Sequence, residues 1–352
     1  MKTMRAIVYH APGDLRLEKQ PLPARTDDNL VVAVYACALC GTDLKLATVG
    51  NPRCHPPRII GHEMAGTIVH AGRNVADFSE GERVTLATTI ACGQCRICAL
   101  GLQNLCPASK PISYDYDGAL AEYMAIPPAA LRGGNVIKIP DGLPNELAAL
   151  SEPLSCAVNA QEIAGVRRGA SVLVVGGGPL GAIQALLAVA HGAGKVMIVQ
   201  RSEPRLSMLR RLKGVTVIDG KAEAVSQFVE RQTDGLGADV VIVCAPAREA
   251  QEAAMAFARK GGTVSLFASL PKGSADITLD SRLVHYGELR VVGASDSRPE
   301  HVRKAVALLA EPKHDFEKVI THSFPLAKFV QAIELMKQKQ TMKVLVYPGE
   351  KP

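Results

Sequence analysis

Four cysteines lie close together in the first third of the chain, in a C-x2-C-x2-C-x7-C array formed by Cys92, Cys95, Cys98 and Cys106. Thiolates at this spacing can surround a tetrahedral zinc ion at Zn–S distances of about 2.3 Å and leave no coordination position open. A bacterial ferredoxin run needs a different spacing before its last cysteine. Two disulfides are the other alternative, which a reducing compartment disfavours. The array therefore predicts a structural zinc site, closed to chemistry.

Further residues of metal-ligand type are spread over three distant segments. Cys40 is followed by Gly-Thr-Asp, His62 and Glu63 are adjacent, and Glu152 directly precedes a proline. A catalytic zinc takes about three protein ligands of mixed nitrogen, oxygen and sulfur type and keeps one position for water or substrate. Cys40, His62 and Glu63 could form that set, with Glu152 as a close or exchanging fourth. From spacing alone, however, a surface salt bridge or a helix cap explains an isolated His-Glu pair better.

The elements that must position these residues follow two patterns. Up to about Leu154, short β-rich runs are separated by Gly and Pro, as in a compact, irregular β domain. From about Gly169, continuous apolar strands alternate with helical patterns, which is typical of a parallel sheet covered on both faces. The runs of the first pattern are at 6–9, 30–37, 66–70 and 83–86. The strands of the second are expected at 171–175, 196–199, 215–218, 239–244, 263–267 and 289–293, with helices around 204–212, 222–232 and 248–259.

These patterns divide the chain into three parts. Residues 1–154 form the β-rich domain, with the cysteine lobe at about 90–107, and residues 155–295 form a doubly wound nucleotide-binding domain. Residues 296–352 hold helices near 299–310 and 326–337 and a last strand at 344–347. Too little chain remains there for a third core, so we expect this tail to return to the first domain.

A glycine-rich turn marks the nucleotide site. Gly176, Gly178 and Gly181 form G-x-G-x-x-G directly after one predicted strand and before one predicted helix, with Pro179 and Leu180 completing the turn. The first glycine allows the tight turn, the second lets the backbone approach a pyrophosphate, and the third permits close helix packing. The strand–turn–helix context makes this a strong prediction of dinucleotide binding.

The choice of nicotinamide cofactor depends on the end of the next strand. NAD enzymes usually carry Asp or Glu there, but this chain has Gln200 and Arg201. Arg201 and Arg205 could pair with a 2′-phosphate, helped by the Ser202 hydroxyl, so NADP(H) is favoured over NAD(H). Glu203 complicates the charge argument, and Arg201 could instead stack on the adenine or face solvent.

The composition describes an ordinary globular chain. Forty basic and thirty-four acidic residues give a net charge of +6, scattered without a nucleic-acid stripe. No apolar run is long enough to cross a membrane, and the N-terminal apolar run is too short for a signal peptide. A cytoplasmic location is therefore expected, where nine cysteines argue for metals or reactive thiols before disulfides. Cys54, Cys156 and Cys244 are interpreted as small buried hydrophobes.

Five motifs occur in a family's order: CGTD at 40–43, GHEMAG at 61–66, the cysteine array, SEPL at 151–154 and VVGGGPLG at 174–181. Over essentially its full length the chain resembles the zinc-dependent medium-chain dehydrogenases, in their sorbitol (polyol) and threonine dehydrogenase branch. The resemblance implies an α/β fold with a GroES-like β-rich catalytic domain and a Rossmann domain. It also implies a catalytic zinc at Cys40, His62 and Glu63, a structural zinc at the array, and a homo-oligomer (dimer or tetramer) assembled through the nucleotide domains.

The implied reaction is reversible hydride transfer between a secondary alcohol and the nicotinamide. Thr42 matches the family's hydroxyl that passes the alcohol proton on, although a local hydrogen bond is the alternative, and Glu152 could displace or orient the zinc water. Many relatives have His in a proton relay at the position of Lys45. Here Lys45 could relay protons, bind a polar or anionic substrate group, or face solvent.

A polyol, sugar or inositol-like alcohol is the expected substrate, and Tyr114 and Tyr116 are candidates to line its cleft. A threonine dehydrogenase or a simple secondary-alcohol dehydrogenase is the alternative. The rival classes are a zinc-free quinone or enoyl reductase, which would lack the ligands, and a non-catalytic NADP(H)-binding sensor, which fold alone does not exclude.

Overall fold

The computed structural model describes residues 2–222 and 224–349. Residues 1, 223 and 350–352, which the expected domains and one expected helix include, lie outside these ranges. The chain divides into two compact units. The first comprises Met1–Ser155, Asp296–Pro312 and Ile320–Pro352, and the second comprises Cys156–Ser295 and Lys313–Val319.

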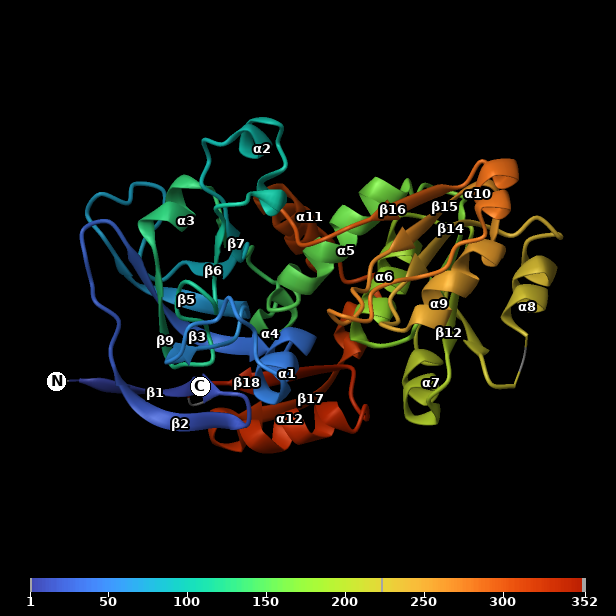
Figure 1. Ribbon diagram of the computed structural model, residues 1–352. Coiled ribbons are helices and arrows are strands. Elements are labelled where there is room, and N and C mark those ends of the chain that lie inside the picture. The colour runs from blue at the N-terminus through green and yellow to red at the C-terminus, as the bar shows by residue number, and fades with distance from the viewer. Residues whose placement is uncertain (1, 223, 350–352) are drawn as a thin grey trace. The chain divides into compact units, whose positions relative to one another are not determined.

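The first unit is built on three antiparallel or mixed sheets (Figure 1). A three-stranded sheet has the order β2 (Asp14–Pro21), β1 (Thr3–Ala11), β4 (Arg58–Ile59). The main sheet has the order β10 (Val136–Lys138), β6 (Arg83–Leu86), β5 (Glu63–Ala71), β3 (Leu30–Ala38), β18 (Lys343–Tyr347), β17 (Ile320–Pro325), and β9 (Tyr123–Ile126) also pairs with β3. A small third sheet joins β7 (Thr89–Ile90) and β8 (Lys110–Pro111). The four runs expected from sequence all lie in strands of the first two sheets.

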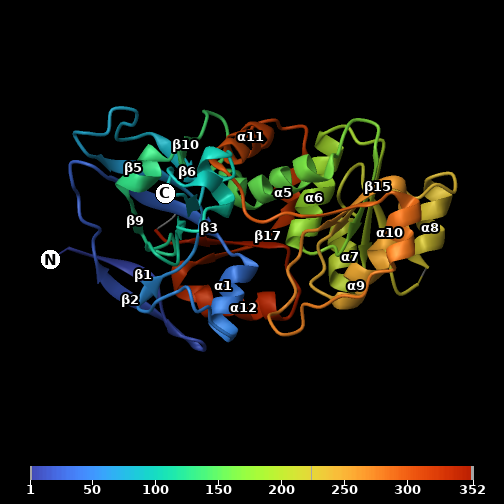
Figure 2. The ribbon, with the colours of Figure 1, turned by 45° about the horizontal axis from the view of Figure 1, so that its top comes forward.

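Helices of the first unit are short and flank the sheets. They are α1 (Gly41–Thr48), α2 (Arg96–Ala99), α3 (Pro128–Arg132), α4 (Asn145–Ala148), α11 (Pro299–Leu309) and α12 (Phe329–Lys337), with 3-10 turns η1 (Gln103–Leu105) and η4 (Leu326–Lys328). The helix α5 (Ser151–Ala164) starts in this unit and continues into the second. Figures 1 and 2 show α1 beside α12, so the segment after Cys40 packs against a helix of the tail.

Strand β3 forms the centre of this unit because both of its faces are apolar. Its sequence LVVAVYACA is buried at seven of nine positions, and it pairs antiparallel with β5, β9 and β18. The pairing of β18 places Val346 opposite Cys37. The tail strand therefore lies directly beside the strand that leads to Cys40.

The second unit contains one six-stranded parallel sheet with helical connections. Its strands stand in the order β13 (Thr216–Asp219), β12 (Lys195–Gln200), β11 (Ser171–Val175), β14 (Ala238–Val243), β15 (Ala258–Leu266), β16 (Arg290–Gly293). Numbered within this unit the order is 3-2-1-4-5-6, that of a dinucleotide-binding sheet. The connecting elements are α6 (Pro179–Ala190), α7 (Glu203–Leu209), α8 (Val225–Gln232), α9 (Arg248–Ala253), η2 (Ala254–Phe257) and α10 (Ser281–Gly287), and η3 (Asp315–Val319) also belongs to this unit.

One expected helix of this unit is wrong at its end. The pattern predicted helix to about Arg259, but α9 stops at Ala253 and β15 begins at Ala258. The Arg259 guanidinium donates to Asp239 at 2.8 Å, and Ala258 pairs with Ala238 of β14. These tertiary contacts draw the segment into the sheet against its local helix propensity. Among the described residues, every helix is too short or too polar to cross a lipid bilayer.

Candidate metal centres and nucleotide site

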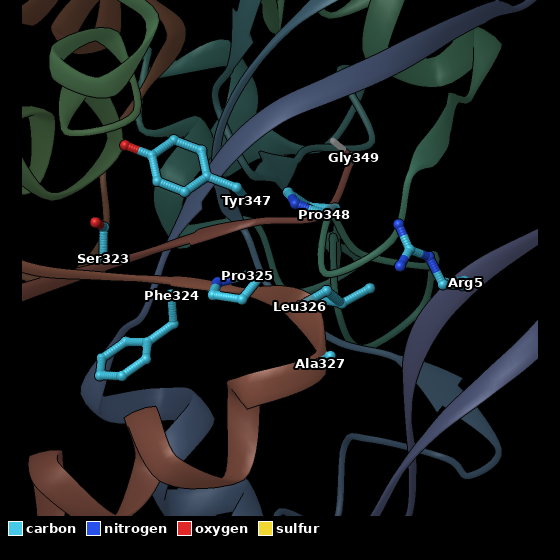
Figure 3. A pocket seen from close by; sticks show the side chains of 9 residues that line it. All are labelled: Arg5, Ser323, Phe324, Pro325, Leu326, Ala327, Tyr347, Pro348 and Gly349. Atoms are coloured by element: carbon cyan, nitrogen blue, oxygen red, sulfur yellow. The ribbon is translucent and has the colours of Figure 1, made fainter. Parts of the chain in front are cut away.

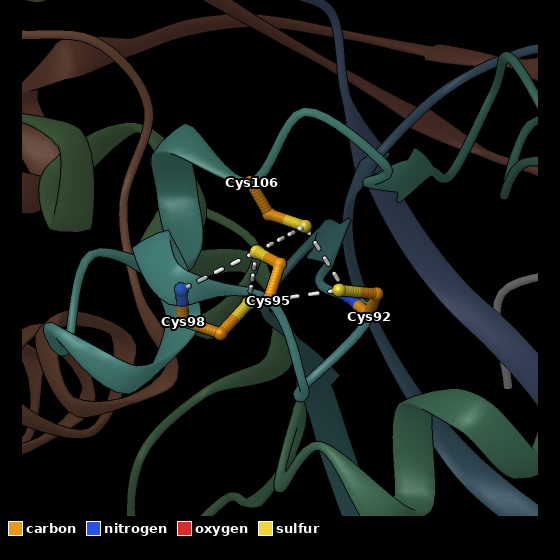
Figure 4. A group of neighbouring side chains, drawn as sticks. All are labelled: Cys92, Cys95, Cys98 and Cys106. Atoms are coloured by element: carbon orange, nitrogen blue, oxygen red, sulfur yellow. Dashed lines mark hydrogen bonds between the residues drawn. The ribbon is translucent and has the colours of Figure 1, made fainter.

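The four cysteines of the array converge in the lobe around α2 (Figure 4). The sulfur of Cys95 lies 3.5 Å from that of Cys98 and 3.9 Å from that of Cys106, and the sulfurs of Cys92 and Cys98 are 4.0 Å apart. Four sulfurs at the corners of a tetrahedral zinc site stand about 3.8 Å apart, since each Zn–S bond is about 2.3 Å. Bonded disulfide sulfurs would be about 2.0 Å apart. The spacing fits a closed zinc site and not two disulfides.

The backbone of this lobe is organised around thiolates. Cys95 caps α2, where its sulfur accepts from the Cys98 N–H at 3.5 Å, and the Cys92 N–H donates to the Cys106 sulfur at 3.4 Å. Backbone N–H groups of Gln94 and Cys95 lower the pKa of Cys92 to about 6, whereas burial raises the pKa of Cys98 to about 12. A dication among the sulfurs would stabilise all four as thiolates, so the donor set suits zinc.

A second group of ligand atoms comes from Cys40, His62 and Glu63, which all lie within 4.8 Å of one another. Cys40 follows β3 and is the N-cap of α1, while Glu63 begins β5. Register explains the meeting: Ala38 at the end of β3 pairs with Glu63. Two neighbouring strands thus bring together residues that are over twenty positions apart in sequence.

Gly61 shapes the approach to His62. Its φ of +92° is in the region that favours glycine, and a Cβ there would stand 2.6 Å from Leu120 Cγ and 2.9 Å from the Cys37 sulfur. No larger residue could therefore hold the turn that points the following His-Glu pair toward Cys40.

The surroundings of this group are anionic and suit a cation. Asp43 is fully buried, with one carboxylate oxygen accepting from the Cys40 N–H at 2.9 Å and the other without a hydrogen-bond partner among the described residues. Burial lowers the pKa of His62, but Cys40, Asp43 and Glu152 outweigh it and raise that pKa well above its ordinary value. Buried anions around one imidazole stabilise positive charge, and these soft and hard donors together suit zinc.

Glu63 has a second partner that sequence reasoning missed. The Lys343 Nζ, at the start of β18, donates to both carboxylate oxygens of Glu63 and to the Leu39 carbonyl at 3.2 Å. Lys343 is only 3% exposed and Glu63 is fully buried. Burial lowers the pKa of Lys343, and the charge of Glu63 more than compensates and raises it. The signal in the sequence was one lysine at the start of an otherwise apolar strand.

Glu152 lies in the first turn of α5, close to the group but not within it. Its carboxylate is within 4.8 Å of that of Asp296, which also accepts from the Thr89 hydroxyl at 2.9 Å. Burial, opposed by His62 and reinforced by Glu63, raises the pKa of Glu152 to about 7. Asp296 is thus a second site residue that sequence reasoning missed, because an aspartate in a polar loop carries no distinctive pattern.

Thr42 and Lys45 both lie on α1, directly after Cys40. Thr42 is half-buried in the first turn, and Lys45 is exposed in the last. The segment that supplies a ligand therefore also carries a hydroxyl and an ammonium group next to it.

The glycine-rich turn has the geometry that a pyrophosphate needs. Gly176 has a φ of +104°, and a Cβ on Gly181 would stand 1.9 Å from the Gly176 carbonyl oxygen. Gly178 is the N-cap of α6, and Pro179 and Leu180 are its first residues. The backbone N–H groups of this helix terminus are a ready site for phosphate.

The residues expected near the adenosine differ from one another in their contacts and in their exposure to solvent. Gln200 folds back, and its side-chain oxygen accepts the N–H groups of Arg201 at 2.7 Å and Ser202 at 3.1 Å. Arg201 is exposed, whereas Arg205 is partly buried, and its Nη1 would be 3.5 Å from a Cβ on Gly178. Burial lowers the pKa of Arg205. Arg205 is thus the cation that lies against the glycine-rich turn.

Comparisons with known proteins were made for the whole chain. The model of the alcohol dehydrogenase GroES-like domain matches residues 26–141, and that of the zinc-binding dehydrogenases matches residues 179–311. The chain is 32% identical to an L-threonine 3-dehydrogenase of Bacillus licheniformis, over 98% of this chain and 99% of that one. It is 31% identical to a sorbitol dehydrogenase of Halalkalibacterium halodurans, over 98% and 99%.

A solved structure agrees with these matches. A chain from Sinorhizobium meliloti 1021, assigned to the zinc-binding dehydrogenases and bound to NADP, has a TM-score of 0.90 at 29% identity and covers 99% of this chain and 100% of its own. The chain belongs to the zinc-dependent medium-chain dehydrogenase family. It is an oxidoreductase that acts on alcohols, and the fold expected from the resemblance, a GroES-like part and a Rossmann-like parallel sheet, is confirmed.

Two further features of this dehydrogenase are the cysteines interpreted as buried hydrophobes and a surface cavity. Cys54 is buried as interpreted, but Cys156 and Cys244 are partly exposed, so the interpretation of these two as small buried hydrophobes is wrong. Cys244 directly follows β14. A surface cavity of about 400 Å³ in the first unit is lined by residues including Arg5, Phe324 and Tyr347 (Figure 3), and none of the predicted site residues lines it.

Proposed function

We propose that this dehydrogenase catalyses reversible hydride transfer between a secondary alcohol of the polyol, sugar or inositol type and NADP(H), with one catalytic and one structural zinc per subunit. The observation that carries the proposal is the convergence of the Cys40, His62 and Glu63 ligand atoms within 4.8 Å, next to Thr42. A zinc-free reductase would have no use for this buried donor set.

Each group in the proposed reaction has a distinct role. A zinc ion held by Cys40, His62 and Glu63 supplies Lewis-acid chemistry, which lowers the pKa of an alcohol. The nicotinamide supplies the hydride acceptor. The Thr42 hydroxyl is the first hydroxyl after the Cys40 ligand and is half-buried, so it can accept the alcohol proton while it releases its own proton to solvent water. Glu152 is a nearby carboxylate that can orient water or exchange as a ligand.

Lys45 has a different role from the histidine of many relatives. Proton relay by a lysine needs burial or a neighbouring cation, and Lys45 is exposed. Its exposure argues against the relay and leaves two roles for its ammonium group: contact with solvent, or binding of a polar or anionic substrate group. A polar substrate is further supported by the charged side chains of Glu152 and Asp296 beside the ligands.

The preference for NADP(H) rests on charge at the end of β12. Gln200 replaces the carboxylate that binds ribose hydroxyls in NAD enzymes, and Arg205 and Arg201 offer positive charge to a 2′-phosphate. The similar chain from Sinorhizobium meliloti was solved with NADP, which supports the same choice.

Three measurements test the proposal. Metal analysis of the purified protein should find two zinc ions per subunit, and a panel of sorbitol, inositol, L-threonine and 2-butanol should show turnover of a polyol with NADP+. Fluorescence titration should find NADPH bound at least tenfold more tightly than NADH, and Arg205→Ala or Arg201→Ala should remove that preference. A zinc-free protein, or one that holds zinc and cofactor without turnover, would contradict it.

L-threonine oxidation is the second candidate function. It is favoured by the 32% identity to an L-threonine 3-dehydrogenase over nearly the whole chain. In the same panel, turnover of L-threonine well above that of the polyols would decide for it.

Assembly through the second unit is part of the proposal. β16 forms an edge of the parallel sheet, and apolar side chains on and near it, Leu283, Tyr286 and Val291, are exposed. An exposed strand edge with apolar neighbours pairs readily with a second copy about a two-fold axis. Light scattering should find a dimer or tetramer that Val291→Lys weakens. The cytoplasmic location remains a prediction.

A further inference from the structure

Two loops of the first unit are joined into one surface beside the candidate catalytic metal centre. Asn51 donates through its amide nitrogen to the Tyr114 hydroxyl at 3.1 Å, and its amide oxygen accepts from the Arg53 N–H at 2.9 Å. The Cys54 thiol donates to the Ser113 carbonyl at 3.4 Å. The segment 51–54 is therefore fixed at two points to the neighbouring residues Ser113 and Tyr114.

Arg53 presents a cation on this surface. Its guanidinium carbon lies 5.9 Å from the centre of the Tyr114 ring, within the range of a cation–π contact, and the side chain is exposed. Within the described residues the guanidinium forms no salt bridge within 4.0 Å, and the carboxylate of Asp296 acts on it electrostatically. A cation–π contact does not use the N–H donors of the guanidinium, which stay available to a ligand.

The surface lies close to the metal ligands. The loop that carries Tyr114 continues into Gly118 and Ala119, whose N–H groups donate to the Ile59 carbonyl at 2.7 Å and the Gly61 carbonyl at 2.8 Å, directly before His62. Burial raises the pKa of Tyr114 to about 12, and the charges of Asp43 and Cys40 add to this rise. Burial likewise raises the pKa of Asp296, against the opposing effects of Thr89, His62 and Arg53. Asp296 therefore lies within electrostatic reach of both the imidazole ligand and the guanidinium. All these residues belong to the first unit.

We propose that Arg53 binds a carboxylate of the substrate, so that this dehydrogenase acts on a secondary alcohol that carries an acid group. The inference rests on the proposed alcohol oxidation and narrows its substrate class. A guanidinium matches a carboxylate with two parallel hydrogen bonds, which a neutral polyol does not offer. Aldonates and hydroxy amino acids share this chemistry. In the second of these, the ammonium group could contact Asp296.

Two matched pairs of substrates isolate the carboxylate. D-gluconate and D-sorbitol have the same six-carbon chain and differ in having a carboxylate or a hydroxymethyl end, and L-threonine and its amide differ only in charge at the acid group. Zinc-loaded wild type and Arg53→Ala are assayed on all four with saturating cofactor, and the Kd of each acid is measured by calorimetry. Arg53→Lys keeps the charge without the planar fork, and Arg231→Ala removes an exposed guanidinium stacked on Phe228 elsewhere.

We expect Arg53→Ala to lower kcat/KM at least tenfold for one acid (about 1.4 kcal/mol), mainly through KM, and to weaken its Kd equally. The kcat/KM of Arg53→Ala for the neutral member of the same pair should change less than twofold. For the acid, the kcat/KM of Arg53→Lys should fall between those of wild type and Arg53→Ala, and that of Arg231→Ala should equal the wild-type value. A response in the gluconate–sorbitol pair would indicate an aldonate substrate, and a response in the pair of L-threonine and its amide would indicate a hydroxy amino acid. Equal losses on both members of each pair, or unchanged acid affinity, overturn the inference.

Failure of the proposed function would give a different result from failure of the inference about Arg53. Turnover of none of the four compounds by wild type counts against alcohol oxidation of this class. The role of Arg53 is then decided by calorimetry alone: weaker binding of an acid to Arg53→Ala supports it, and no binding of either acid to wild type refutes it. An unchanged Tm of Arg53→Ala shows that the fold is intact.

Discussion

The Lys343 Nζ donates to both carboxylate oxygens of Glu63, across 280 positions of sequence and inside the core of the first unit. A bidentate contact fixes the plane of the Glu63 carboxylate beside Cys40 and His62. An outer partner of this kind orients a ligand and tunes its affinity for metal. The tail strand β18 is thus part of the candidate metal centre and not only a cover for the sheet.

Lys343→Met should destabilise the fold strongly. The change leaves the Glu63 charge buried without its partner, which costs about 3–5 kcal/mol. Chemical denaturation should show this loss, and metal analysis should find less zinc at the catalytic site. The double variant Lys343→Met with Glu63→Gln should recover part of the stability. Lys138→Met, which breaks an exposed pair with Glu82, should lose less than about 1 kcal/mol. Similar losses in both single variants would show that burial of the pair is unimportant.

Gly61→Ala should unfold more easily than Gly81→Ala, although both glycines have a φ near +90°. The left-handed backbone costs each variant about 1–2 kcal/mol. At Gly61 the new Cβ also clashes with Leu120 and Cys37, whereas nothing lies within 4 Å at Gly81. Thermal unfolding should therefore separate the two, with zinc lost at the catalytic site only in Gly61→Ala. Equal Tm values would mean that the close packing before His62 relaxes without cost.

Cys95→Ser should reduce the zinc content from two ions per subunit to one. The remaining three sulfurs no longer close a tetrahedral site, and the lobe around α2 should lose protection in hydrogen exchange. Cys244→Ala removes a thiol far from either ligand group in sequence and should retain both ions. If Cys95→Ser also retains two ions, the array does not hold a metal.

Gln200→Glu should abolish the cofactor preference. The substitution keeps the acceptor for the Arg201 and Ser202 N–H groups and adds a negative charge where a 2′-phosphate would bind. Like charges then repel, and the affinity for NADPH should fall at least tenfold, or about 1.4 kcal/mol, with that for NADH unchanged. Parallel fluorescence titrations measure both values. An equal effect on the two cofactors would place the 2′-phosphate elsewhere.

Ionisation of Asp239 should make the free energy of unfolding depend on pH in the acid range. Burial would raise its pKa, but the Ser171 N–H and hydroxyl, both at 2.8 Å, and Arg259 outweigh burial and lower it. The ionised carboxylate therefore stabilises the fold above the unfolded-state pKa of about 3.9, and this contribution disappears as the pH falls through the lower folded-state pKa.

Asp239→Asn should accordingly lose about 1–3 kcal/mol at pH 7 in urea unfolding. The gap to wild type should close below about pH 4. Asp27→Asn, at an exposed pair with Arg73, should differ by less than about 1 kcal/mol at any pH. A gap for Asp239→Asn that persists in acid would point to packing instead of charge.

Local patterns made much of the fold predictable from sequence. Strands such as β11 are continuous apolar runs between glycines, and the glycine-rich turn carries its own spacing, so the parallel sheet follows from short-range information. The cysteine array is local in the same way. The predicted end of α9 was wrong because the tertiary contact between Arg259 and Asp239 draws the segment after Ala253 into the sheet. Local helix propensity carries no information about that contact.

The candidate sites were less accessible from sequence. Cys40 and His62 could be named through motifs, but the partners Lys343 and Asp296 come from distant segments and have no pattern of their own. The sequence pattern did not decide between Arg201 and Arg205 as the phosphate ligand, and only the burial of Arg205 against Gly178 distinguishes the two. The part of the site that is formed by contacts between distant segments therefore could not be predicted from residue spacing.

The distance between Glu63 and Lys343 along the chain also has a consequence for biosynthesis. The ribosome makes Cys40, His62 and Glu63 early and Lys343 only 280 residues after Glu63, so β18 takes its place beside β3 after nearly all of the first unit has been translated. A nascent chain therefore carries an acidic, thiol-bearing donor set before the ammonium group that restrains it exists. The candidate metal centre is in this sense completed late, and chains that stall before β18 would lack the lysine that fixes the Glu63 carboxylate.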